Sequence, residues 1–251
     1  MSSFNALVTR IQQFQQTIPP TVQIIAVTKQ QPAAVVRAAY AAGLRHFGES
    51  RVQEAQAKQA ELADLTDVTW HLIGQLQRNK VKKALQLFQW IHSIDRLELA
   101  QQIDRLAAEE RPSTIPLNLV TGQSQNSDLV SRSVQERPQI CLQVKLLPDP
   151  NKIGWEVHEL WQALPQLNQL THIQIRGLMV IPPLGCSDRQ LSDYFQQAKQ
   201  LAQQITANGW ENLQLDQLSM GMSDDYNLAI KAGATMIRPG RILFGDRQNG
   251  I

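Results

Sequence analysis

The sequence predicts an α/β protein in which one (β/α)8 barrel of the TIM type spans residues 1–251. Eight short apolar runs alternate with amphipathic stretches, a pattern typical of a parallel sheet covered by helices. Eight is also the number of parallel strands that closes such a barrel. The length of 251 residues is ordinary for a barrel of this type.

An additional helix is expected before the first strand. Phe4, Leu7, Ile11, Phe14 and Ile18 recur at helical spacing, with glutamines between several of them. This segment lacks the continuous apolar stretch of a secretory signal, and no apolar run in the chain approaches the roughly 18 residues of a membrane span. We therefore expect a cytoplasmic protein.

The barrel elements follow in strict alternation. The expected strands cover residues 23–28, 45–47, 69–73, 89–93, 141–146, 173–180, 214–219 and 235–237. The expected helices cover residues 32–42, 51–63, 79–87, 96–109, 155–164, 189–208 and 223–231. A polar segment over residues 119–139 interrupts the pattern before the fifth strand, and we interpret it as an insertion on the amino-terminal face of the barrel.

A doubly wound open sheet is the structural alternative. Such a sheet, when it binds a dinucleotide, carries a glycine-rich turn after its first strand. Here the first strand runs into Thr28-Lys29-Gln30-Gln31-Pro32, and neither GxGxxG nor GxxxxGK[ST] occurs in the sequence. The sequence therefore favours the barrel and disfavours a nucleotide site of either kind.

Composition excludes several other classes of function. The net charge is +2, from 24 basic and 22 acidic residues, which indicates neither a nucleic-acid-binding stripe nor a membrane-binding face. The two cysteines, Cys141 and Cys186, are too few and too far apart for a disulfide framework or a cysteine zinc site. No metal site is expected.

Barrel proteins place their functional residues where the strands end at the carboxyl-terminal face. Lys29 directly follows the first expected strand. The run Ser219-Met220-Gly221-Met222-Ser223 follows the seventh, and Arg238-Pro239-Gly240-Arg241 follows the eighth. Loops after strands seven and eight frequently bind phosphate in this fold. We therefore expect Lys29 to face an anion site built near the other end of the chain.

The residues of this expected anion site have suitable chemistry. Ser223 is predicted to cap a helix whose free N–H groups could donate to a phosphate. Gly221 and Gly240 would allow a ligand close to the backbone. Asp224 and Asp225 would repel a phosphate, so we expect them to point away from it.

A lysine facing a phosphate site suggests a phosphorylated aldehyde held as an imine. The amine must be neutral to attack a carbonyl, so its pKa must fall below the ordinary value of about 10.4. Burial in the barrel mouth and a neighbouring cation such as Arg238 would both lower the pKa of Lys29.

Six ordered motifs resemble the pyridoxal phosphate homeostasis protein family, and its cyanobacterial members in particular. The motifs are Ala26–Lys29, Phe47–Glu54, Trp70–Gln77, Arg176–Met179, Leu218–Asp225 and Arg238–Gly245. The last of them also resembles the end of the barrel domain in alanine racemases. The resemblance covers nearly the whole chain outside the insertion.

The resemblance implies specific roles for these residues with pyridoxal 5'-phosphate (PLP). Lys29 matches the lysine that forms the imine, and Arg238 matches the arginine beside the pyridine nitrogen or the phosphate. Ser219 and Ser223, with the backbones of Gly240 and Arg241, match the residues around the phosphate. Gly221 remains a candidate because it has no Cβ. Ser50 stands where family members often have asparagine, which leaves its contact to the ring substituents open.

Each of these residues also has a simpler interpretation. Lys29 alone would be a solvated lysine. Ser219–Ser223 could form a helix cap, and Arg238–Gly240 a surface turn. His71 lies in an apolar strand and is more typical of a core or hydrogen-bonded histidine than of a ligand. The stretch Glu49–Glu54 could be a helix start with a solvated face.

We expect a carrier of PLP that supports vitamin B6 and amino-acid homeostasis rather than an enzyme, as the resemblance implies. A racemase needs a second acid–base group opposite the lysine. The sequence ends soon after the last barrel motif, so we expect no such group from a further domain. The alternatives are an amino-acid racemase of low activity and a partner protein in nitrogen signalling. We expect a monomer with transient contact to PLP-dependent enzymes.

Overall fold

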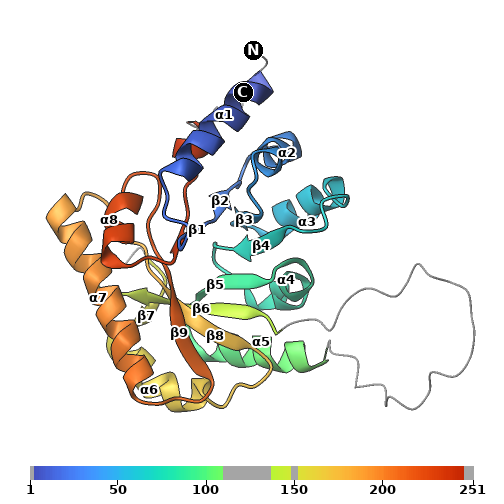
Figure 1. The fold of residues 1–251 in the computed structure, drawn as a ribbon. Helices are drawn as coiled ribbons and strands as arrows, with labels where there is room; N and C mark the ends of the chain where they lie inside the picture. Colours follow the sequence, from blue (N-terminus) through green and yellow to red (C-terminus); the bar gives the residue numbers. More distant parts are fainter. Residues whose placement is uncertain (1–2, 110–136, 148–151, 246–251) are drawn as a thin grey trace, which may run out of the picture.

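The computed structural model describes residues 3–109, 137–147 and 152–245. Its parallel strands form a ring at the centre of the molecule, and helices cover the outside of this ring (Figure 1). The sheet runs in the order β1-β10-β9-β8-β6-β5-β4-β3-β2, so neighbours in the chain are neighbours in the ring. This is the predicted barrel architecture.

The first strand position closes the ring. It consists of β1 (Gln23–Ile24) and β2 (Ala26–Val27), separated by one residue. β1 pairs with β10 (Met236–Ile237), whereas β2 pairs with β3 (His46–Glu49). The Val27 N–H also donates to the Pro239 carbonyl at 2.9 Å. The start of the barrel is thus hydrogen-bonded to both its second and its last strand.

The remaining strands and helices alternate around the ring. Of the ten strands in the sheet, β7 lies off the ring and β1 and β2 share one position, so the ring has eight positions, as predicted. The other strands are β4 (Thr69–Leu72), β5 (Trp90–Ile94), β6 (Gln139–Lys145), β7 (Trp155–Glu156), β8 (Gln174–Met179) and β9 (Leu213–Ser219). The helices are α1 (Ser3–Gln16), α2 (Ala33–Ala41), α3 (Val52–Glu61), η1 (Arg78–Lys80), α4 (Val81–Leu87), α5 (Leu97–Glu109), α6 (Val157–Leu167), α7 (Asp188–Ala207), α8 (Tyr226–Ala232) and α9 (Arg241–Phe244).

The predicted helix over residues 155–164 begins two residues later than expected. Trp155 and Glu156 form β7, which pairs in parallel with β6. Trp155 is buried and its Nε1–H donates to the Ile94 carbonyl at 3.0 Å, which holds this residue in the sheet. Glu156 then forms a capping box with Glu159 and starts α6.

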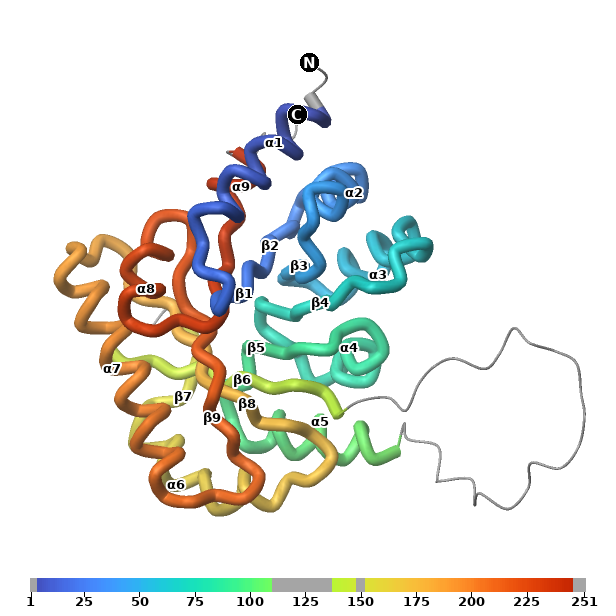
Figure 2. The backbone as a smooth tube through the Cα atoms, viewed as in Figure 1, coloured from blue at the N-terminus to red at the C-terminus, as the bar shows by residue number. Residues whose placement is uncertain are grey.

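The expected N-terminal helix is α1. It packs along α2 and α9, so the first and last helices of the described chain lie side by side (Figure 2). Ile11 is fully buried, and the Phe14 ring meets the Tyr226 ring of α8 edge-on with 5.2 Å between centroids. The helix therefore covers the seam where the barrel closes.

The insertion predicted over residues 119–139 lies outside the described residues up to position 136. Its last residue, Gln139, belongs to β6 instead, where its N–H donates to the Gln89 carbonyl at 2.9 Å. α5 ends at Glu109 and β6 begins at Gln139, and both positions are at the amino-terminal ends of the strands. The described flanks are thus on the face opposite Lys29.

Candidate functional site

Lys29 lies at the carboxyl-terminal face of the barrel, two residues after β2. It is half-buried in a turn in which the Gln31 N–H donates to the Thr28 carbonyl at 2.9 Å. Since the Val27 N–H bonds to the Pro239 carbonyl, Lys29 follows a strand that is paired with the segment leading into Gly240. The segment around Lys29, early in the chain, and the segment around Gly240, late in the chain, thus meet at this face, as the sequence predicted.

A buried polar cluster holds the turn that carries Lys29. Thr28 Oγ1 donates to Glu49 Oε1 at 2.6 Å, and Lys58 Nζ donates to the same oxygen at 2.5 Å. Lys58 Nζ also donates to the Thr28 carbonyl at 2.8 Å. Glu49 is fully buried at the end of β3, so its interpretation as a solvated helix start is wrong. The cluster fixes the backbone on the N-terminal side of Lys29.

Arg238 is a buried cation next to Ser219. The exposed fraction of Arg238 is 4%, and Ser219 is fully buried at the end of β9. Arg238 Nη1 donates to Ser219 Oγ at 2.8 Å and Nη2 donates to the Val180 carbonyl at 3.0 Å. Burial lowers the pKa of Arg238 to about 10, so the guanidinium remains charged at neutral pH. Its five N–H groups exceed these two bonds, which leaves donors for an anion.

Ser223 is not the helix cap that its position suggested. α8 begins at Tyr226 with Asp225 as N-cap residue, and Asp225 Oδ1 accepts from the Met222 N–H at 2.6 Å. Ser223 Oγ instead accepts from the N–H groups of Gly240 at 3.2 Å and Ile242 at 3.1 Å. Both acceptor positions of the hydroxyl are therefore filled, and its proton can donate to a ligand.

Gly240 and Arg241 were expected to surround the phosphate, but the structure gives each of them another contact. The Gly240 N–H is bonded to Ser223 Oγ, so this group orients the serine. The Arg241 side chain forms an exposed ion pair with Asp224. The Asp224 carboxylate in this pair is exposed, whereas the buried Asp225 is turned back onto its own loop.

Gly221 is required by the backbone between β9 and α8. Its φ is +94°, and a Cβ atom there would lie 2.7 Å from the Ala229 Cβ. The Gly221 carbonyl accepts from the Arg238 N–H at 2.8 Å, which joins the two loops of the site. Close packing of α8 thus accounts for this glycine without a ligand.

Ser50 directly follows β3 and is half-buried. Its backbone lies so close to Gly74 that a Cβ atom on Gly74 would come within 2.3 Å of the Ser50 carbonyl oxygen. The Gly74 carbonyl in turn accepts from Ser93 Oγ at 2.6 Å. Ser50 is therefore held at the same face as Lys29, and its contact to a cofactor stays a prediction.

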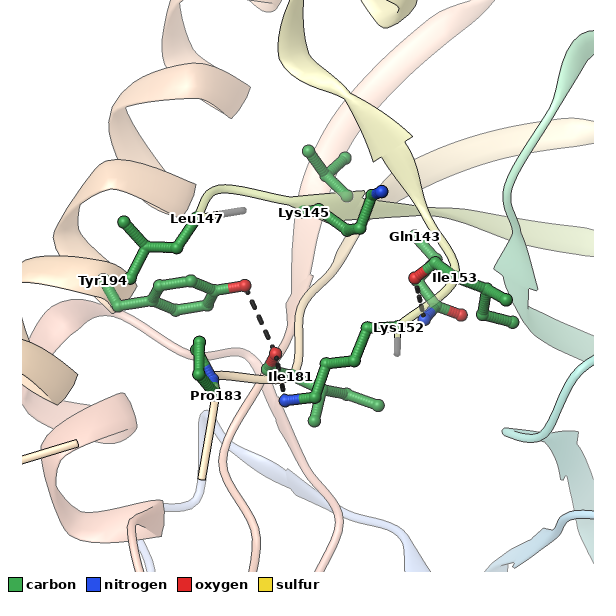
Figure 3. Close-up of a pocket in the computed structure, with 9 residues that line it drawn as sticks. Gln143, Lys145, Leu147, Lys152, Ile153, Ile181, Pro183 and Tyr194 are labelled. Atoms are coloured by element: carbon green, nitrogen blue, oxygen red, sulfur yellow. Dashed lines mark hydrogen bonds between the residues drawn. The ribbon is translucent and has the colours of Figure 1, made fainter. Parts of the chain in front are cut away.

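A small pocket lies at this face between β6, β7 and the loop after β8 (Figure 3). Lys152 Nζ and the Tyr194 hydroxyl both donate to the Ile181 carbonyl, each at 3.3 Å. Gln143 Nε2 donates to the Ile153 carbonyl at 2.8 Å. The pocket volume of about 10 Å³ is enough for one water molecule and not for a cofactor ring.

Sequence reasoning missed the partners of Ser219 inside the barrel. Ser219 Oγ lies 2.8 Å from His92 Nδ1, and His92 Nε2 lies 2.9 Å from His71 Nδ1. His71 is thus the buried, hydrogen-bonded histidine that its apolar strand indicated. The signal in the sequence is that three consecutive strands each contain a histidine, at positions 46, 71 and 92.

The geometry fits a small phosphorylated ligand. A buried arginine and a serine hydroxyl with filled acceptor positions supply donors of the kind that bind phosphate. Lys29, two residues after β2, lies on the neighbouring segment of the same face.

Comparison with known proteins assigns the family. Residues 3–248 match the profile of the alanine racemase N-terminal domain. The pyridoxal phosphate homeostasis protein of Synechocystis sp. is 48% identical over 233 residues, which cover 92% of this chain and 94% of that relative. The chain belongs to the pyridoxal phosphate homeostasis protein family. The family member from Escherichia coli K12 is 32% identical and aligns with 91% of this chain and 87% of its own length.

Solved structures show the same fold. PipY of Synechococcus elongatus with PLP bound has a TM-score of 0.82 and 48% identity, covering 95% of this chain and all of PipY. The alanine racemase of E. faecalis has a TM-score of 0.63 at 16% identity, covering 98% of this chain and 59% of the racemase. The likeness to the racemase is one of fold alone.

Two observations concern other kinds of site. Within residues 3–109, 137–147 and 152–245, no helix is sufficiently long and apolar to span a membrane. The same ranges contain no group of three or more histidine, cysteine or acidic residues arranged to hold a metal ion.

Proposed function

We propose that this protein binds PLP through Lys29 and supports vitamin B6 and amino-acid homeostasis without a dedicated catalytic reaction. The observation that carries the proposal is the hydrogen bond from Val27 to Pro239, which brings the strand before Lys29 alongside the segment from Arg238 to Arg241. The structure of PipY with PLP bound, at 48% identity, supports the ligand assignment.

Each residue of the site has a defined part in this proposal. When bound, PLP supplies an aldehyde that reacts with amines and a ring that withdraws electrons. Lys29 holds the aldehyde as a Schiff base, and Ser223 donates its hydroxyl proton to the phosphate. Arg238, with Ser219 behind it, supplies positive charge beside the ring nitrogen or the phosphate. Ser50, Gly221, Gly240 and Arg241 complete the wall of the site.

The three tyrosines, which could supply a second acid–base group, have other contacts in the structure. Tyr40 donates its hydroxyl to Asp67 at 2.6 Å, and Tyr194 donates to the Ile181 carbonyl. Tyr226 packs its ring on Phe14. This favours the carrier over a PLP-dependent racemase, because racemisation needs an acid–base group on the far side of the substrate carbon.

The surroundings of the protein are also proposals. We infer a cytoplasmic monomer that transfers PLP during transient contact with PLP-dependent enzymes or interacts with a nitrogen-signalling partner. Light scattering coupled to size-exclusion chromatography would test the monomer, because a mass near twice 28.3 kDa would contradict it.

The decisive experiment is spectroscopic. Purified protein incubated with PLP should absorb in the visible range, and borohydride should fix the ligand on the peptide that contains Lys29. Lys29→Ala should remove the absorbance, whereas Lys231→Ala, in α8, should retain it. A colourless wild-type protein, or label on another lysine, would overturn the proposal. Racemase turnover that disappears in Lys29→Ala would favour the enzyme instead.

Arg238→Gln tests the cation at the site. We expect this variant to retain its circular dichroism and to lose PLP during dialysis more readily than wild type, because a charge that attracts the ligand is gone. Arg105→Gln is the matched control, since Arg105 forms an exposed ion pair with Glu109 near the end of α5, on the opposite side of the barrel. Equal PLP occupancy in Arg238→Gln and wild type would contradict the role of Arg238.

A further inference from the structure

A line of hydrogen-bonded side chains runs through the barrel from one face to the other. His46 Nδ1 lies 2.9 Å from His71 Nε2, and His71 Nδ1 lies 2.9 Å from His92 Nε2. His92 Nδ1 is 2.8 Å from Ser219 Oγ, which accepts from Arg238 Nη1. His46 is the first residue of β3, at the amino-terminal face, whereas Ser219 is the last residue of β9. We call these three histidines with Ser219 the histidine chain.

The contact with Arg238 limits the directions of the hydrogen bonds in the histidine chain. A guanidinium can only donate, so Ser219 Oγ accepts from Arg238 and can direct its own proton to His92 Nδ1. His92 then carries its proton on Nε2 and donates to His71 Nδ1. By the same step His71 donates from Nε2 to His46 Nδ1. When the Ser219 proton has no acceptor other than His92 Nδ1, the three neutral imidazoles are therefore each the Nε2–H tautomer.

The far end of the histidine chain is open to solvent. His46 is half-buried and lines an open pocket of about 410 Å³ on the amino-terminal face, together with Gln15, Gln23 and Arg45. A proton from water can therefore reach His46, while His71 and His92 are fully buried.

Among the residues that the structure describes, few charged groups lie beside the histidine chain. At the open end, Arg45 is held by an ion pair with Asp67 at 2.6 Å and lies over the Tyr40 ring. In the middle, the Trp90 ring stacks on His71 with 5.8 Å between centroids.

At the inner end of the histidine chain stands Arg238. Asp225 and the buried thiol of Cys141 are near enough to act on its charge.

Adding one proton to the histidine chain allows a second arrangement in which all of its hydrogen bonds are again formed. If His46 is protonated on both nitrogens, its Nδ1–H must donate to His71 Nε2. His71 then donates from Nδ1 to His92 Nε2, and His92 donates from Nδ1 to Ser219 Oγ. Ser219 now accepts from both His92 and Arg238, so its hydroxyl proton must find another acceptor.

We propose that the histidine chain is a switch in which a proton taken up by His46 at the amino-terminal face turns the Ser219 hydroxyl from His92 toward an acceptor at the carboxyl-terminal face. His46, His71 and His92 are then positioning residues that act through Ser219 and Arg238. The part of PLP phosphate as that acceptor rests on the proposed function, whereas the switch itself rests on the contacts of the chain.

The resting arrangement at neutral pH follows from burial. Burial lowers the pKa of His46 and of His71 below the ordinary value, and it lowers the pKa of His92 to about 3. The three imidazoles are therefore neutral in the free protein. An acceptor at Ser219 favours the reversed arrangement and so raises the pKa of His46, which couples ligand binding to proton uptake.

Nitrogen-15 NMR of histidine-labelled protein tests the switch without PLP, because the imidazole shifts distinguish the two tautomers. Above the ordinary histidine pKa of about 6.5, all three should be Nε2–H tautomers. On acidification, His71 and His92 should change to Nδ1–H tautomers in the same step that protonates His46. The signals of His158 and His172, which do not belong to the histidine chain, serve as internal references. An Nδ1–H tautomer of His71 at alkaline pH, or three unrelated titrations, would overturn the switch.

His46→Asn isolates the proton at the open end. The asparagine oxygen can accept from His71 as His46 Nδ1 does, but it cannot be protonated, so the variant should fold and lose the tautomer change. His158→Asn should keep it. With PLP, wild type should take up as much as about one proton more per ligand than His46→Asn. Equal proton uptake with intact PLP binding would exclude the coupling, whereas absent PLP binding would refute the proposed function and leave the NMR result to decide the switch.

Discussion

The ion pair between Glu49 and Lys58 is the most deeply buried charge pair described beside the candidate site. Glu49 is fully buried, the exposed fraction of Lys58 is 5%, and Glu49 Oε2 has no hydrogen-bond partner among the described residues. Burial raises the pKa of Glu49 and outweighs the opposing hydrogen bonds from Lys58 and Thr28. The ion pair therefore fixes the conformation of the turn that carries Lys29, and it contributes little to the free energy of unfolding.

Glu49→Gln tests the sign of this shift. A carboxyl with a raised pKa binds its proton more tightly in the folded state, so its contribution to stability is full below the unfolded pKa. The contribution is lost as the pH rises through the folded pKa. The free energy of unfolding of wild type should therefore fall relative to Glu49→Gln on raising the pH from about 4 to 7, at no more than about 1.4 kcal/mol per pH unit. Urea titrations at both pH values measure it.

Glu61→Gln is the matched control, because Glu61 lies at the exposed end of α3. A difference between wild type and Glu49→Gln that stays constant with pH, or grows in the opposite direction, would contradict the raised pKa of Glu49.

The sequence predicted which residues lie at the candidate site more completely than it predicted their hydrogen-bond partners. Lys29, Ser219 and Arg238 were found because each stands at the end of an apolar run, and strand ends share one face of a parallel barrel. The bond between Ser219 and His92 joins residues 127 positions apart, so no local pattern indicates it. The two N–H groups that occupy Ser223 Oγ likewise come from a different loop.

At the scale of elements, the loop between β9 and α8 is defined by Gly221. Its positive φ turns the chain, and its missing Cβ lets α8 approach. Its carbonyl accepts from the Arg238 N–H, so the loop after β9 is joined to the residue that follows β10. The sequence predicted a helix from Ser223 because serine is a common N-cap, but Asp225 accepts from Met222 and delays the helix to Tyr226.

Gly221→Ala should destabilise the protein by two separable effects. The positive φ costs about 1–3 kcal/mol for a residue with a Cβ, and the 2.7 Å approach to Ala229 adds the cost of displacing α8. Gly185→Ala is the matched control, since Gly185 has φ +80° and nothing within 4 Å of the added Cβ. Thermal unfolding of both variants should show the larger loss for Gly221→Ala.

If Gly221→Ala and Gly185→Ala lowered the stability equally, backbone strain would account for both. The contact between Gly221 and α8 would then have no part in holding the loop.

At the scale of the whole molecule, closure of the ring brings Lys29 and Arg238 to one face. The eight strand positions followed from the alternation of apolar runs, because a buried parallel strand leaves a short apolar segment whatever its neighbours are. β7 escaped prediction because two residues carry no periodicity. Its place depends on the bond from Trp155 to Ile94, which lies 61 positions earlier in the chain. That residues 1–251 form one domain stays a prediction.

The same separation of faces leads to a prediction for the polar insertion. α5 ends at Glu109 and β6 begins at Gln139 on the amino-terminal side, whereas Lys29 and Ser219 lie on the carboxyl-terminal side. Replacing residues 119–136 by a short glycine–serine linker should therefore leave the PLP absorbance and PLP retention unchanged. The deletion must stop before Gln139, because its N–H pairs with Gln89 in the sheet. Loss of the absorbance with an intact thermal transition would show that the insertion reaches the opposite face.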